Sequence, residues 1–134
     1  MAKIVGLRRY PEGEDVLAEA LDEMILIKGV GIEGERKRAD ARQVSLLTED
    51  ACRWAQAQEN LCCGKTFNAN ILLDGSLKGV ERLTLDDVVL RISSKKFCAH
   101  KGKGSVCPLY EGAAFAQILE GGQITVGECF TALK

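Results

Sequence analysis

The feature that most constrains the fold is a recurrence of short apolar segments, each bounded by residues that favour turns. The segments are rich in Val, Ile and Leu, and breaks such as Pro11-Glu12-Gly13 and Asp74-Gly75 separate them. Short strands divided by turns at intervals of about 8–12 residues favour a closed or nearly closed β-barrel. We expect strands at residues 2–9, 24–30, 43–47, 70–73, 81–84, 88–92, 123–126 and 129–133.

The connections between these segments predict two hairpins. Residues 81–84 and 88–92 would turn at Leu85-Asp86-Asp87, and residues 123–126 and 129–133 would turn at Gly127-Glu128. Both pairs have the alternation and the intervening turn residues of antiparallel neighbours.

Two or three short helices complete the prediction. Thr48 is a good N-cap, and Glu49 and Asp50 favour the first turn of a helix that would run to about Gln58. Apolar spacing also favours a helical turn over 14–22 and a helix from Pro108 to Leu119, which Gly121-Gly122 would close. The predicted fold class is therefore mostly β, a barrel with two or three short helices, as one domain over residues 1–134.

Composition limits the possible partners. A length of 134 residues with 46% hydrophobic residues allows one domain with a core, and the net charge of −1 argues against general nucleic-acid binding. No apolar run could span a membrane, and the first residues lack the apolar core of a signal peptide. We expect no nucleic-acid or membrane partner, a cytoplasmic location, and reduced thiols at all six cysteines.

The segment Ser94–Pro108 concentrates the residues with reactive chemistry. It holds Cys98, Cys107, the single histidine His100 and four lysines, without any Asp or Glu. A thiol among cations ionises more readily, and the thiolate is the form that attacks and binds metals. The segment could bring a reactive sulfur to an anionic cofactor, with His100 as its proton partner. The alternative is a solvated basic loop above two packed cysteines.

Four motifs in chain order resemble the MOSC domain, a family named for the C-terminal domain of molybdenum cofactor sulfurase. Cys98 falls at the family's characteristic cysteine. The sequence departs from the family where Lys37 replaces a histidine, Ala69 a glutamate and Phe97 a proline. The resemblance covers nearly the whole chain, as a small stand-alone member, and rests on Gly31–Arg36 with Arg42–Thr48, Phe67–Ile71 with Gly75, Cys98, and Phe115–Leu119 with Gly121-Gly122 and Gly127-Glu128.

The resemblance implies a MOSC-like barrel that binds the molybdenum cofactor, a molybdopterin, or carries sulfur for its sulfuration. Cys98 would carry a persulfide or ligate molybdenum, assisted by His100. The anionic cofactor or its precursor would be held by Arg36, Arg42, Asn70 and Lys101. The alternative for Asn70 is that its side chain holds a loop backbone and does not touch the ligand. A chain of this kind would be a sulfurtransferase-like component that works with a cysteine desulfurase or a molybdoenzyme, and no pyridoxal phosphate is expected.

Two alternatives follow from the same residues. A non-catalytic interaction module would keep the barrel and dock on a molybdoenzyme or a cofactor-biosynthesis enzyme, as the lost histidine and glutamate favour. A zinc site could use Cys62 or Cys63 with Cys98, His100 and Cys107, all of which are acceptable ligand types.

Overall fold

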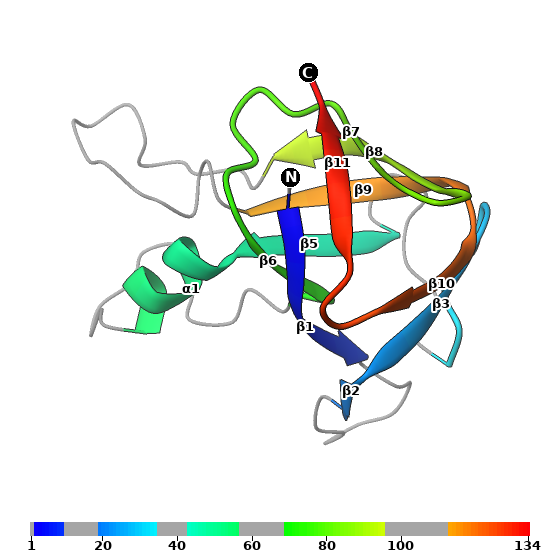
Figure 1. The fold of residues 1–134 in the computed structure, drawn as a ribbon, viewed down its shortest axis with the longest axis horizontal. Coiled ribbons are helices and arrows are strands. Elements are labelled where there is room, and N and C mark those ends of the chain that lie inside the picture. The colour runs from blue at the N-terminus through cyan, green and yellow to red at the C-terminus, as the bar shows by residue number, and fades with distance from the viewer. Residues whose placement is uncertain (1, 10–18, 35–42, 57–68, 96–112) are drawn as a thin grey trace.

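The computed structural model describes residues 2–9, 19–34, 43–56, 69–95 and 113–134, which form strands and one helix (Figure 1). The elements in chain order are β1 (Ala2–Arg9), β2 (Glu19–Leu21), β3 (Glu23–Ile27), β4 (Gly31–Ile32), β5 (Val44–Thr48), α1 (Glu49–Gln56), β6 (Ile71–Asp74), β7 (Arg82–Leu85), β8 (Val88–Lys95), β9 (Ala113–Glu120), β10 (Gly122–Thr125) and β11 (Cys129–Leu133).

Seven strands close into a barrel, which confirms the predicted fold class. Their order is β11-β7-β8-β9-β5-β6-β1, and the pairing of β11 with β1 closes the ring. β2 pairs with the last residues of β1, Leu7–Arg9, and a separate sheet has the order β10-β3-β4. Among the described strands, β5 and β6 are the one parallel pair, and α1 lies in the connection between them.

The barrel interior is filled by aliphatic side chains, as the scarcity of aromatic residues requires. Alternate residues along each strand point inward, so one face of each strand supplies the core. Phe130 is fully buried at the closing seam, where its register partner on β1 is Ala2. Other fully buried side chains are Ile4, Leu46, Ile71, Leu73, Leu83, Leu90 and Ile124.

The strand directions define two ends of the barrel. One end, here called the α1 rim, carries the last residues of β5, β6, β8 and β11 and the first residues of β1, β7 and β9. The other end, here called the β3 rim, carries the opposite ends of these strands. In Figure 1 both chain termini lie in the upper part of the view, α1 lies at the left, β3 and β10 lie at the right, and β2 lies at the bottom.

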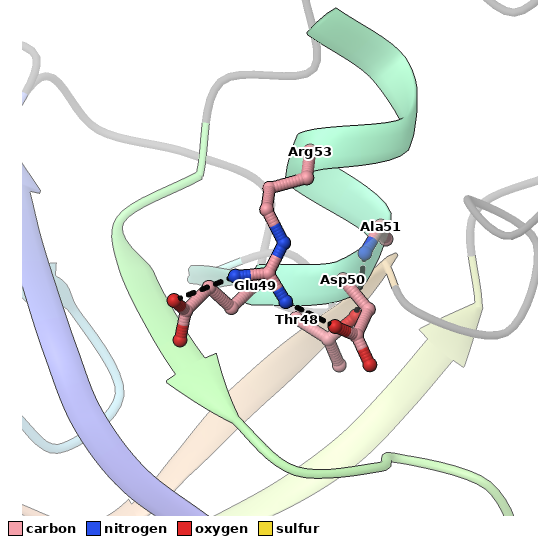
Figure 2. Close-up of polar contacts among 5 residues, drawn as sticks. All are labelled: Thr48, Glu49, Asp50, Ala51 and Arg53. Atoms are coloured by element: carbon pink, nitrogen blue, oxygen red, sulfur yellow. Dashed lines mark hydrogen bonds and ion pairs between the residues drawn. The ribbon is translucent and has the colours of Figure 1, made fainter. Parts of the chain in front are cut away.

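The helix after Thr48 is confirmed. The Thr48 hydroxyl accepts a hydrogen bond from the Ala51 backbone N–H at 3.3 Å, which is the contact expected of an N-cap (Figure 2). Arg53 reaches back to Glu49 at 3.0 Å and also contacts Asp50. These pairs are solvent-exposed, so the capping contact and packing against β5 and β6 contribute more to α1 than the ion pairs do.

The predicted helix up to Leu119 is wrong over its described part. Residues 113–120 form β9, a strand paired with β5 on one side and β8 on the other. Ala113, Ala114 and Ala116 favour helix in isolation, but their small side chains also fit a buried strand between two neighbours. Residues 108–112 lie outside the described part of the chain.

Two other local predictions are also corrected. Residues 19–21 of the predicted helical turn form β2 on the edge of β1. β10 pairs with β3, and β11 pairs with β7 and β1, so no pairing joins β10 and β11 into a hairpin within the described residues. Gly121 lies in the turn from β9 to β10, where an added Cβ would meet the Leu26 carbonyl oxygen at 2.3 Å. This glycine therefore permits a close backbone approach and does not end a helix.

Candidate functional site

Most of the predicted site residues fall outside the described part of the chain. Arg36, Arg42, Cys98, His100 and Lys101 belong to this group, and so do Cys62, Cys63 and Cys107. Their proposed contacts therefore stay predictions. Asn70 is the predicted cofactor-binding residue that the structure describes.

The segment that carries Cys98 leaves and rejoins the barrel at one place on the α1 rim. β8 ends at Lys95, which pairs with Ala114 near the start of β9. On the other side of β9, Ala113 pairs with Leu47 of β5. Leu47 is followed by Thr48 and then by α1. Lys95 and Ala113, the two attachment points of residues 96–112, thus lie on the side of the barrel where α1 begins. Cys98 follows Lys95 by three residues, so the Cα atoms of these two residues can be at most about 10 Å apart.

The segment that carries Arg36 and Arg42 rejoins the barrel at the opposite rim. Gln43 directly precedes β5, and its side-chain oxygen accepts a hydrogen bond from the Ile118 backbone N–H at 2.9 Å. Gln43 and Leu47 are four residues apart along β5, a distance of about 13 Å in a strand. The attachment points of the two predicted clusters are therefore at different ends of the barrel, a separation that linear sequence did not reveal.

Asn70 is fully buried and holds three segments together. Its side-chain oxygen accepts hydrogen bonds from the Ser45 backbone N–H and hydroxyl, both at 2.9 Å. Its amide donates to the Arg8 carbonyl oxygen at 3.2 Å, and its backbone N–H donates to the Ser45 hydroxyl at 2.9 Å. Contact with a cofactor would require the side chain to give up these bonds. Asn70 thus positions the start of β6 against β1 and β5.

Arg9 is a neighbour of the first motif that sequence reasoning did not single out. Its guanidinium donates to the Glu33 carbonyl oxygen at 3.4 Å and lies so close to Gly34 that an added Cβ would be 2.6 Å from its Nη1 atom. Gly34 also has a φ of +82°, a conformation that side chains rarely adopt. Both facts explain glycine at the position that leads toward Arg36. In the sequence, the two adjacent basic residues Arg8 and Arg9 were the available indication that Arg9 takes part in such a contact.

A surface hollow of about 610 Å³ opens on the α1 rim near the chain ends. Two of its lining side chains, Lys78 and Lys134, are cationic, and no acidic residue lines it. The rest of the lining comes from Ala2, Ser76, Gly79, Val80 and Ala132. This hollow was not predicted from the sequence, because the turn after β6 and the end of β11 meet only through the barrel closure.

The described residues contain no metal centre of their own. Within these ranges, no group of three or more His, Cys, Asp or Glu side chains could hold a metal ion. Cys129, on β11, is a free half-buried thiol. In the same part of the chain, no helix has the length and apolar character needed to cross a bilayer.

Comparison with known proteins shows the fold. No protein-family model matches the sequence, and no curated protein matches it. Among solved structures, YuaD from Bacillus subtilis matches at 14% identity and a TM-score of 0.66, over 96% of this chain and 93% of YuaD. YiiM from Escherichia coli matches at 14% identity and a TM-score of 0.59, over all of this chain and 70% of YiiM.

A second YiiM structure, from Geobacillus stearothermophilus, matches at 12% identity and a TM-score of 0.57, over all of this chain and 76% of that protein. At such identities the likeness establishes the fold alone. The chain therefore has the fold of the small MOSC-like proteins YiiM and YuaD, as its sequence motifs had indicated.

Proposed function

We propose that this chain is a molybdenum cofactor-associated protein that uses Cys98 to bind the cofactor or to carry sulfur for its sulfuration. The observation that carries the proposal is the insertion of residues 96–112, with their two cysteines, histidine and lysines, between Lys95 and Ala113 at the rim of a MOSC-like barrel. The fold and the order of the other three motifs support the same assignment independently of that segment's composition.

In this proposal Cys98 supplies a thiolate, which is a soft ligand suited to molybdenum and a nucleophile suited to persulfide exchange. His100 is the proton partner of the thiol. Lys101, in the same short segment, would attract the cofactor's phosphate. The chain would act in the cytoplasm, and its sulfur donor or acceptor would be a cysteine desulfurase or a molybdoenzyme.

Arg36 and Arg42 keep their proposed role as guanidinium anchors for the anion. Their segment rejoins the barrel at the β3 rim, whereas the Cys98 segment is attached at the α1 rim. The two arginines would therefore approach a cofactor near the α1 rim from the opposite end of β5. Asn70 would act on the site by fixing the start of β6, since its polar groups bond to Ser45 and Arg8.

The test compares two cysteine variants of protein purified from its native cell without reductant. Cys98→Ala should lower bound molybdenum and persulfide sulfur at least tenfold, measured by metal analysis and intact mass. Cys129→Ala is the matched control, because that thiol is free and half-buried on a barrel strand. Equal retention by both variants would remove Cys98 from the mechanism.

The mass measurement also separates the two roles of Cys98. Extra sulfur on the protein without molybdenum would assign a sulfur carrier, and molybdenum with a pterin would assign a cofactor-binding protein. The non-catalytic module predicts neither, and a pterin fluorescence titration should then show no saturable binding.

A further inference from the structure

A row of outward-facing residues crosses four neighbouring strands of the barrel; three of them are exposed and Gln117 is half-buried. Leu133 on β11 lies opposite Arg82 on β7, Arg82 lies opposite Arg91 on β8, and Arg91 lies opposite Gln117 on β9. Residues opposite each other share a face of the sheet. The next row, Leu83, Leu90 and Ile118, is buried, so this row faces outward. We call Leu133, Arg82, Arg91 and Gln117 the arginine row; its strands are labelled in Figure 1.

The two arginines stand directly opposite each other, an arrangement of like charges that normally destabilises a sheet. Arg91 donates to the Gln117 side-chain oxygen at 2.7 Å. Within the described ranges no carboxylate forms an ion pair with Arg82 or Arg91. Glu120 lies two rows of paired residues away from Arg82, and its ion pair is with Lys28 at 3.3 Å. The described part of the chain thus supplies no paired carboxylate to neutralise these two neighbouring arginines.

The positive surface continues from the row onto the α1 rim. Lys134 follows Leu133 in sequence, and it lines the surface hollow together with Lys78. Four cations therefore lie on this side of a chain whose net charge is −1, and one exposed acidic residue, Glu81, precedes Arg82 among them. Such local clustering attracts an acidic partner even when the whole molecule is nearly neutral. Leu133 is 45% exposed beside them and offers an apolar contact.

We infer that the arginine row is a docking face for an acidic protein surface. Guanidinium groups bind carboxylates through paired hydrogen bonds, so two adjacent arginines suit two neighbouring Asp or Glu side chains. Small-molecule sites are usually concave, whereas this row lies on the outer face of a sheet and spans about 14 Å across four strands. The inference involves no cysteine and stands whether or not Cys98 binds a cofactor.

The experiment uses a fluorescently labelled deca-glutamate peptide as the probe and follows its anisotropy on titration with the full chain. Arg82→Glu and Arg91→Glu should each weaken binding at least tenfold. Arg8→Glu is the matched control, because it makes the same charge change at an exposed residue on β1; it should change affinity less than threefold. Equal losses in all three variants would mean a nonspecific charge effect and would overturn the proposal.

A second measurement distinguishes docking from a structural role and from a small-anion site. Arg82→Gln removes the like-charge contact, so it should keep or raise the melting temperature while it weakens peptide binding. A lower melting temperature would assign a structural role instead. Inorganic phosphate should not displace the peptide at matched ionic strength; saturable displacement at low millimolar phosphate would assign a small-anion site and overturn the protein-docking assignment.

Discussion

At the scale of single residues, the buried polar groups are engaged in holding the barrel together. Asn70 sits where the chain enters β6, and its side chain bonds to Ser45 on one neighbouring strand and Arg8 on another. A buried donor that loses its partner costs about 1–3 kcal/mol, because it has given up water without replacement. The asparagine that resembles a family motif residue thus has a measurable structural role.

Asn70→Ala should lower the free energy of unfolding by about 2–3 kcal/mol, because the Ser45 N–H and hydroxyl lose their acceptor. Urea unfolding followed by circular dichroism would measure the loss. Gln123→Ala, at an exposed amide that contacts Glu23, should change stability by less than about 0.5 kcal/mol. An Asn70→Ala protein as stable as the wild type would leave Asn70 free for a direct role in cofactor binding.

At the scale of elements, α1 shows how a local signal survives in the folded protein. The hydroxyl of Thr48, the acidic first turn and the i,i+4 pair of Arg53 with Glu49 all act within a few residues of each other. β9 shows the opposite case, since its alanines have strong helix propensity and become strand because β5 and β8 pair with both edges.

Thr48→Ala should destabilise the protein by about 1 kcal/mol, since the Ala51 N–H loses its capping acceptor. Thr48→Ser keeps the hydroxyl and should recover most of this loss. The two variants are compared by urea unfolding. If the serine variant is no more stable than the alanine variant, packing of the threonine methyl, and not the cap, accounts for the effect.

At the scale of the whole molecule, barrel closure joins the two ends of the described chain. β11 pairs with β1 through Ala2 and Phe130 and through Lys3 and Cys129, and it continues alongside β7. Closure also brings the turn after β6 to the end of β11, where the hollow with its two lysines forms. Closure at this seam therefore stabilises the barrel and also brings together Lys78 and Lys134, the two lysines of the hollow.

Phe130→Ala should cost about 3–5 kcal/mol, because a fully buried aromatic ring at the seam is removed and its space is not refilled. Leu133→Ala is the control on the same strand; with 45% exposure it should cost less than about 1 kcal/mol. Chemical denaturation of both variants is the measurement. Similar small losses would mean that the seam contributes little to folding stability.

The sequence by itself determined the features that depend on neighbouring residues. Alternation and turn residues predicted β1, β3, β5, β6 and the β7–β8 hairpin, and the Thr48 cap predicted α1, because these signals act over a few residues. The order of motifs was sufficient to indicate the MOSC-like fold.

The tertiary structure decided what depends on long-range pairing. It made β9 a strand and separated β10 from β11. It also placed the attachment points of the Arg42 and Cys98 segments at opposite rims. Strand partners far apart in the chain fix these outcomes, because backbone hydrogen bonds and burial across the sheet outweigh local propensity.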